Sequence, residues 1–177
     1  MLKQWQRANL YFNRMIYFSV RKAFTLIELL VVVAIIGIIA AVGTPIFQGF
    51  LLDAKINSSR ESHIRMRDYI SASFAKCAGS PDGKIQLGSK KHRCDGNTYS
   101  MAGDFYDYFI GEAGFENPYN KSIPAIVRNS ETIGNTTAKG QTFIIGNIKP
   151  YNYIKIITNI GNQNNDDKLI SDNIIRE

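Results

Sequence analysis

The chain has 177 residues, 45% of them hydrophobic, which is enough to build one globular domain with a core. Its formal net charge is +6, but five of its 21 basic residues lie among the first 23 positions, where no acidic residue occurs. The remaining 16 basic and 15 acidic residues leave a net charge of +1, so the charge of residues 24–177 gives no indication of nucleic-acid binding.

Residues 1–23 form a basic leader. Its cations are Lys3, Arg7, Arg14, Arg21 and Lys22. A positively charged segment in front of a long apolar run is typical of a targeting element whose charged end stays in the cytoplasm. We therefore expect the chain to enter a membrane with its N-terminus on the cytoplasmic side.

Residues 24–52 are predicted to form a membrane-spanning helix. They contain a single charged side chain, Glu28, and from Leu29 to Val42 every residue is apolar apart from the neutral Gly37. About 20 helical residues cross the hydrocarbon core of a bilayer, and this segment reaches that length. The apolar run exceeds the roughly 7–15 residues of a secretion signal, so a plain cleaved signal is the weaker interpretation.

The helix is predicted to continue to about residue 77 as an amphipathic segment. Residues of one helical face recur every three or four positions, namely Leu52, Ile56, Ser59, His63, Met66, Ile70, Phe74 and Cys77. We expect this face to pack on a globular domain, with His63 as a packed side chain rather than a ligand. Gly37, Gly43 and Pro45 weaken the helix before this segment, because proline removes a backbone hydrogen bond, so a kink or local melting is expected there.

The rest of the chain shows short apolar alternations. Ala102–Gly114 is predicted to be a short helix or a strand that buries Phe105, Tyr108 and Phe109. Three further segments are predicted to be strands: Gln141–Ile148, Tyr153–Ile160 after a turn at residues 149–152, and Lys168–Ile175. The predicted fold is therefore α+β, with a long N-terminal helix, hydrophobic and then amphipathic, packed on a small antiparallel β-sheet.

The run Arg21-Lys22-Ala23-Phe24-Thr25-Leu26-Ile27-Glu28-Leu29 resembles the class III signal of type IV prepilins, a family that includes the pseudopilins of type II secretion. The resemblance extends from Arg21 to Phe50, and Gly37 and Pro45 fall where these proteins carry helix-loosening residues. Ala23 stands where the family nearly always has glycine, and both residues are small. The resemblance implies cleavage between Ala23 and Phe24 by prepilin peptidase, N-methylation of Phe24, and polymerisation with other pilin subunits by the inner-membrane pilus assembly machinery.

Glu28 is the candidate assembly residue. Cleavage after Ala23 would create an α-amino group on Phe24, about 6 Å of helix rise from Glu28. If identical helices are staggered, the amine of one subunit can pair with Glu28 of its neighbour, which offsets part of the desolvation of both charges. The alternative is that Glu28 lies at the membrane surface without a role.

These expectations give three segments. Residues 1–23 are a removed leader, residues 24–52 a transmembrane and filament-core helix, and residues 53–177 a periplasmic or extracellular globular domain that includes the helix of about 53–77. The expected function is that of a structural subunit of a type IV pilus, located in the inner membrane as a precursor and outside the cell in the filament. A pseudopilin or an uncleaved single-pass membrane protein remains an alternative. No catalytic motif is present in the sequence, so neither an enzyme nor a cofactor is expected.

Three features of residues 77–173 complete the sequence-based expectations. Cys77 and Cys94 form an even pair in an exported chain, so a disulfide is expected, with two free thiols as the alternative. The basic cluster Lys90–Arg93 is expected to be a solvated loop rather than a site for DNA or another anionic surface. Residues 162–173 are rich in oxygen ligands but lack the pattern of an EF-hand, so calcium binding remains open and no metal residue is assigned.

Overall fold

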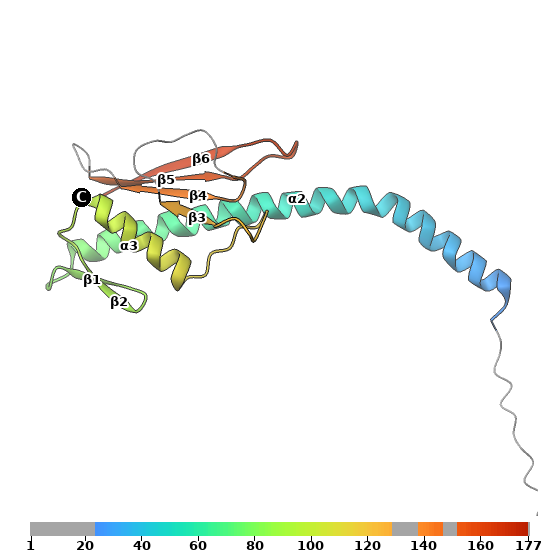
Figure 1. Cartoon of the computed structure of the whole chain (residues 1–177), viewed down its shortest axis with the longest axis horizontal. Helices are drawn as coiled ribbons and strands as arrows, with labels where there is room; N and C mark the ends of the chain where they lie inside the picture. Colours follow the sequence, from blue (N-terminus) through green and yellow to red (C-terminus); the bar gives the residue numbers. More distant parts are fainter. Residues whose placement is uncertain (1–23, 129–137, 147–151, 177) are drawn as a thin grey trace, which may run out of the picture. The chain divides into compact units, whose positions relative to one another are not determined.

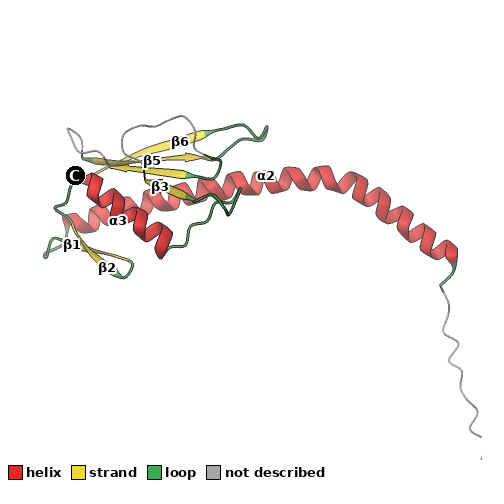
Figure 2. Cartoon of the chain, viewed as in Figure 1, coloured by secondary structure: helices red, strands yellow, loops and turns green. Residues whose placement is uncertain are grey.

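The computed structural model describes residues 24–128, 138–146 and 152–176 (Figure 1). Its elements are, in chain order, α2 (Leu26–Ala78), β1 (Lys84–Leu87), β2 (Lys90–Arg93), α3 (Thr98–Gly111), β3 (Ile126–Arg128), β4 (Thr142–Gly146), β5 (Tyr153–Asn159) and β6 (Leu169–Ile175) (Figure 2). The chain divides within α2 into two units, Met1–Gly43 and Thr44–Glu177. The α+β fold with a long N-terminal helix is confirmed, whereas the predicted segment boundaries at residues 23 and 52 stay predictions.

The long helix α2 has 53 residues and includes Pro45. The backbone is helical from Leu26 to Ala78, so the local melting expected near Gly37–Pro45 is absent from this helix. One missing backbone hydrogen bond is a small loss in a helix of this length, because the hydrogen bonds of the adjoining turns remain. The loosening role of Gly37, Gly43 and Pro45 during assembly stays a prediction.

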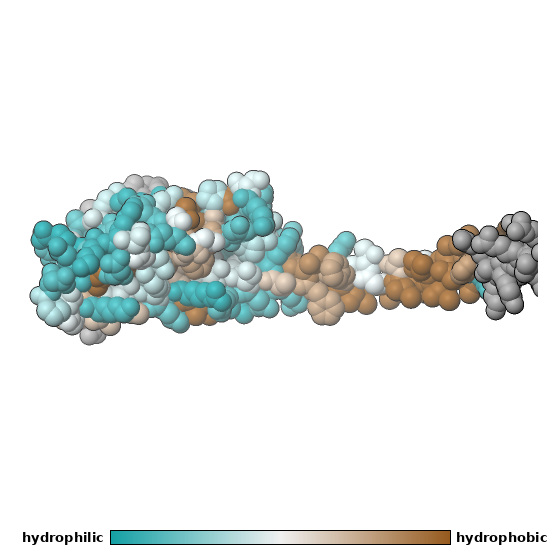
Figure 3. Space-filling view, turned by 90° about the horizontal axis from the view of Figure 1, so that it is seen from below, coloured by the Kyte–Doolittle hydropathy of each residue, from teal (hydrophilic) through white to brown (hydrophobic). Residues whose placement is uncertain are grey.

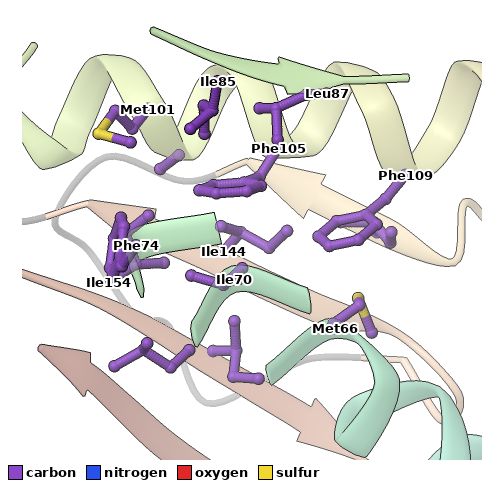
Figure 4. Close-up of a cluster of buried hydrophobic side chains, with 14 of the residues drawn as sticks. Met66, Ile70, Phe74, Ile85, Leu87, Met101, Phe105, Phe109, Ile144 and Ile154 are labelled. Atoms are coloured by element: carbon purple, nitrogen blue, oxygen red, sulfur yellow. The ribbon is translucent and has the colours of Figure 1, made fainter. Parts of the chain in front are cut away.

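The predicted stripe on the second half of α2 is buried from Ile56 to Phe74, whereas Leu52 and Cys77 at its ends are half-buried. The side chains of Ile56, Ser59, His63, Met66, Ile70 and Phe74 are all at most 8% exposed. Met66, Ile70 and Phe74 join the hydrophobic core together with residues of α3, among them Met101, and of both sheets (Figure 4). The three-to-four-residue spacing therefore identified the face on which the globular unit is built.

The larger sheet has the strand order β3-β4-β5-β6. Strands β4, β5 and β6 form the predicted antiparallel arrangement, in which Ile144 lies opposite Ile156. The sheet also contains one parallel pair, because β3 pairs with β4 in parallel. Strand β3 has only three residues, too few to show a periodic pattern, and it was not predicted.

The predicted core face of β5 is buried almost completely. Ile154, Ile156, Thr158 and Ile160 are each at most 1% exposed. The opposite face is also largely covered at its C-terminal end, where Ile157 is 6% exposed and Asn159 is fully buried. Strand β5 is thus a central strand with its core face toward α2 and α3, as the alternation predicted.

The segment Ala102–Gly114, which was predicted to be a short helix or a strand, lies mostly in a helix, α3 (Thr98–Gly111). Asn97 caps its N-terminus, since the side chain of Asn97 accepts a hydrogen bond of 2.7 Å from the amide of Ser100. Phe105 and Phe109 are buried, and the half-buried ring of Tyr108 stacks on Tyr69 with a centroid separation of 4.6 Å. These contacts attach α3 to the second half of α2.

The basic cluster Lys90–Arg93 is strand β2, which corrects the expectation of a loop. It pairs with β1 in a two-stranded antiparallel hairpin, in which Ile85 lies opposite His92. Ile85 and Leu87 are buried under the hairpin, whereas Lys90, Lys91 and Arg93 are exposed. A strand of four mostly charged residues carries no apolar alternation, and its pairing with buried β1 stabilises it instead.

Candidate processing and assembly site

The first turn of α2 is closed by hydrogen bonds between Thr25 and Glu28. The amide and the hydroxyl of Thr25 donate to Oε2 of Glu28 over 2.8 and 2.7 Å, and the amide of Glu28 donates to Oγ1 of Thr25 over 3.3 Å. Thr25 directly precedes the first helical residue, Leu26, so the two side chains form a capping box. The Thr-x-x-Glu spacing within the motif is therefore also a helix-start signal.

The carboxylate of Glu28 is only partly engaged by this cap. Both donors of Thr25 bind to Oε2, and within the described residues Oε1 of Glu28 accepts no hydrogen bond and the side chain forms no ion pair. The neighbouring side chains of Phe24, Leu26, Ile27 and Leu29 are apolar and 61–81% exposed. An acceptor oxygen thus lies in an apolar surface that nothing in the described chain covers.

Of the other residues predicted for this site, some lie within the described part of the chain and others lie outside it. Phe24 is the first described residue and immediately precedes the cap, whereas Ala23 and the leader lie outside the described residues. Gly37 and Gly43 lie on α2, where a Cβ atom added to either would have no neighbour within 4 Å. Neither glycine is therefore required by packing within the single chain.

The first half of α2 is apolar and uncovered. Large hydrophobic side chains from Leu26 to Leu51 are 46–81% exposed. In the space-filling view of Figure 3, the narrow part of the chain is mostly hydrophobic, whereas the globular part has a mainly hydrophilic surface. By length and composition, α2 could cross a membrane. A surface of this kind is stable only in lipid or against other apolar helices.

Comparison with known proteins shows which proteins this segment is similar to. Residues 19–44 match the profile of the prokaryotic N-terminal methylation motif. The N-terminal segment is similar to that of type IV fimbrial proteins. A stretch of 37 residues is 54% identical to the fimbrial protein EcpB of Eikenella corrodens, and it covers 21% of this chain and 23% of that protein. A stretch of 52 residues is 42% identical to the type IV major fimbrial protein FimA of Dichelobacter nodosus, and it covers 29% of this chain and 33% of that protein.

The prepilin similarity is confined to part of the chain. The matches span a third or less of the length of these curated relatives, and no solved structure matches the chain. Both matched proteins are fimbrial proteins. The pilin-like architecture of the remaining residues is therefore known from the structure of this chain alone.

The predicted disulfide is present. Cys77, at the end of α2, is bonded to Cys94, which follows β2, and their Cα atoms are 5.5 Å apart. Arg176, next to the C-terminus, donates hydrogen bonds from its guanidinium group to the carbonyl oxygens of Cys94 and Gly96. The disulfide and Arg176 together attach the loop after α2 to the helix and to the end of β6.

His63 is a packed histidine, as expected, but its partners were not predictable. Its ring nitrogens contact Oγ1 of Thr158 at 2.8 Å and Oδ2 of Asp172 at 3.0 Å. Burial lowers the pKa of His63 below its usual value of 6.5, because the imidazolium is poorly solvated, and the carboxylate of Asp172 opposes this shift only in part. His63 therefore joins α2 to β5 and β6 in its neutral form.

His92 and the oxygen-rich segment at residues 162–173 are each held by contacts within the chain. Nδ1 of His92 lies 3.1 Å from Oδ2 of Asp104 in α3. The oxygen-rich segment forms a loop in which the amide of Asp166 donates to Oδ1 of Asn162 over 2.8 Å. Within the part of the chain that the structure describes, no group of three or more His, Cys, Asp or Glu side chains is placed to hold a metal ion.

Proposed function

We propose that this chain is a structural subunit of a type IV pilus. In this proposal the precursor is inserted in the inner membrane with a cytoplasmic N-terminus, prepilin peptidase cuts it between Ala23 and Phe24, and Phe24 is methylated. The mature subunit then polymerises with other pilin subunits through α2. The observation that carries the proposal is the capped start of an uncovered apolar helix immediately after the predicted cleavage point.

The chemistry of assembly follows from the two groups that processing would bring together. Cleavage places a cationic amine on Phe24, next to the cap formed by Thr25 and Glu28. In this proposal, the amine of a staggered neighbour pairs with the Oε1 atom of Glu28, which the cap leaves open. A charged pair inside an apolar bundle is favourable only when both charges are matched. The pairing would therefore select one axial register among the many that apolar helices allow.

The cap has a second consequence for this pairing. Because Thr25 fixes the carboxylate through Oε2, Glu28 loses little conformational entropy when an incoming amine binds. The hydroxyl of Thr25 would then act as a positioning group for Glu28.

The proposal is tested by the N-terminus of the mature protein and by its location. Mass spectrometry of the chain from sheared surface filaments should find a first residue Phe24 that carries a methyl group. A chain that keeps residues 1–23 in the membrane would contradict the proposal and support an uncleaved single-pass anchor. A processed chain that is absent from surface filaments, and whose loss abolishes protein secretion, would instead indicate a pseudopilin.

A further inference from the structure

A polar groove lies beside the point where the apolar part of α2 ends. One wall is formed by Asp53, Asn57 and Arg60 of α2, and the other by residues of the loop from Gly161 to Lys168, which joins β5 and β6. The groove has a volume of about 540 Å³ and contains the buried side chain of Ile56 in its lining. Its residues all belong to the unit Thr44–Glu177.

The charged side chains of this groove are not paired with one another or with other described residues. Among the described residues, the side chains of Asp53, Arg60 and Lys168 form no hydrogen bond and no ion pair. Outside the groove, the same helix carries an ion pair in which Nε of Arg65 donates a hydrogen bond to Oε1 of Glu61 over 2.9 Å. The groove thus presents one anionic and two cationic groups that are available to a ligand.

The helical wall places these groups along one line. Positions 53, 57 and 60 follow the i, i+4, i+7 spacing, so they share a face and span about 10 Å of helix rise. Asp53 lies at the end next to the apolar segment, and Arg60 lies two turns further along. The anion and the cation are therefore separated along the helix axis rather than paired with each other.

The opposite wall is held in place by hydrogen bonds of the loop. The amide of Asn165 donates to the carbonyl oxygen of Asn162 over 3.0 Å, and Asn165 adopts a left-handed backbone with φ of 62°. Nζ of Lys139 donates to Oδ1 of Asn165 over 2.9 Å, and Nδ2 of Asn159 donates to Oδ1 of Asp167 over 2.8 Å. These bonds preform the wall that carries Lys168.

The position of the groove along the sequence indicates the environment that surrounds it. The exposed apolar side chains of Ile46, Phe47, Phe50 and Leu51 directly precede Asp53 in the same helix. If this segment is in the membrane, as the proposed function requires, the groove lies at the level of the lipid headgroups on the non-cytoplasmic side. Lysine and arginine bind phosphate there, and a carboxylate binds an ammonium group.

We propose that the groove binds the headgroup of a zwitterionic, amine-bearing phospholipid such as phosphatidylethanolamine. Arg60 and Lys168 contact the phosphate, and Asp53 accepts hydrogen bonds from the primary ammonium group. The inference rests on the membrane insertion contained in the proposed function. The bound lipid would hold the base of the globular unit at the membrane surface until the subunit enters a filament.

The test uses the full chain in nanodiscs that contain equal amounts of phosphatidylethanolamine and phosphatidylcholine. Native mass spectrometry then measures which lipid the released protein retains. Phosphatidylcholine has the same phosphate, but its quaternary ammonium group cannot donate a hydrogen bond to Asp53. The wild-type chain should retain phosphatidylethanolamine in several-fold excess over phosphatidylcholine.

Variants separate the contributions of the two kinds of charge. Asp53→Asn should lose the preference between the lipids but keep bound lipid, whereas the double variant Arg60→Gln, Lys168→Gln should lose most of both lipids. Arg65→Gln removes a cation from the same helix outside the groove, so it should behave as the wild type. An equal loss of lipid in Arg65→Gln and in the double variant would overturn the inference.

A separate measurement distinguishes failure of this inference from failure of the proposed function. Extraction at alkaline pH shows whether the chain is integral to the bilayer. An integral chain that retains the two lipids in the proportion of the mixture overturns the groove inference alone. A chain that is extracted as a peripheral protein overturns both the inference and the membrane insertion on which it rests.

Discussion

Thr25 and Glu28 form reciprocal hydrogen bonds at the start of α2. Thr25 donates two hydrogen bonds to Oε2 of Glu28 and accepts one from the backbone amide of Glu28. The resemblance to type IV prepilins leads us to expect that Glu28 pairs with the Phe24 amine of a neighbouring subunit in the filament. The structure adds that this carboxylate already has an orientation in the single chain. Two of the predictions below separate its charge from its orientation.

The first prediction concerns the charge of Glu28. Glu28→Ala should insert in the membrane, because removal of a charge from an apolar helix eases insertion, and it should be cut after Ala23. It should fail to enter filaments, because the amine of an incoming Phe24 would have no counter-charge. Glu28→Gln keeps the shape but not the charge and should be nearly as defective.

The measurement is the ratio of sheared filaments to the membrane pool in a pilus-competent host that lacks the native subunit. Gln48→Ala is a matched control, since it removes an uncharged polar side chain from the same exposed part of α2. A normal filament yield from Glu28→Ala would rule out the pairing role.

The second prediction concerns the orientation of Glu28. Thr25→Val keeps a β-branched side chain but removes the hydroxyl, so the first turn of α2 should lose about 1 kcal/mol of capping free energy. Glu28 keeps its charge but not its fixed position. Filament yield should therefore fall, but less than for Glu28→Ala.

Thr25→Ser retains a capping hydroxyl and should restore the wild-type yield. If Thr25→Val and Thr25→Ser gave the same yield as the wild type, the cap would have no part in assembly.

The third prediction concerns the disulfide. The bond between Cys77 and Cys94 closes a loop with a sequence separation of 17 residues. Cys77→Ser should lower the free energy of unfolding of the globular unit by about 3 kcal/mol, since the unfolded chain gains the freedom of the open loop. Chemical unfolding of the full chain in detergent, followed by near-ultraviolet circular dichroism of the core aromatic residues, measures this loss. Wild-type protein treated with a reductant should unfold at the same denaturant concentration as the variant, and a midpoint equal to that of oxidised wild type would contradict the prediction.

The fourth prediction concerns His63 and pH. The pKa of His63 is lowered in the folded chain by burial, against a carboxylate of Asp172 that raises it and a guanidinium of Arg67 that lowers it. The unfolded chain therefore binds more protons as the pH falls below the ordinary value of about 6.5, and the folded state loses stability in that window. The free energy of unfolding should be smaller at about pH 5.5 than at about pH 7.5.

His63→Gln cannot gain this proton, yet its side chain can still form hydrogen bonds with Thr158 and Asp172. The variant should therefore show a weaker dependence of stability on pH over the same range, even if its stability at neutral pH is lower. An unchanged pH dependence in His63→Gln would assign the effect to another group.

The sequence by itself determined the features that depend on near neighbours. The change from an all-round apolar helix to an amphipathic one, and the buried stripe from Ile56 to Phe74, follow from a spacing of three or four residues, because side chains at that spacing share one face of a helix. The strands β4, β5 and β6 could be predicted from local pattern as well, because alternating apolar and polar residues indicate a strand with one buried face.

The tertiary structure alone decided which distant residues meet. His63 reaches Asp172 across 109 positions, and β3 pairs in parallel with β4, although neither contact leaves a periodic signal in the sequence. The polar groove likewise joins residues 53–60 of α2 to the loop at residues 161–168. Such contacts depend on how the sheet is placed on the helix, and that placement is set by the packing of the whole core rather than by any local pattern.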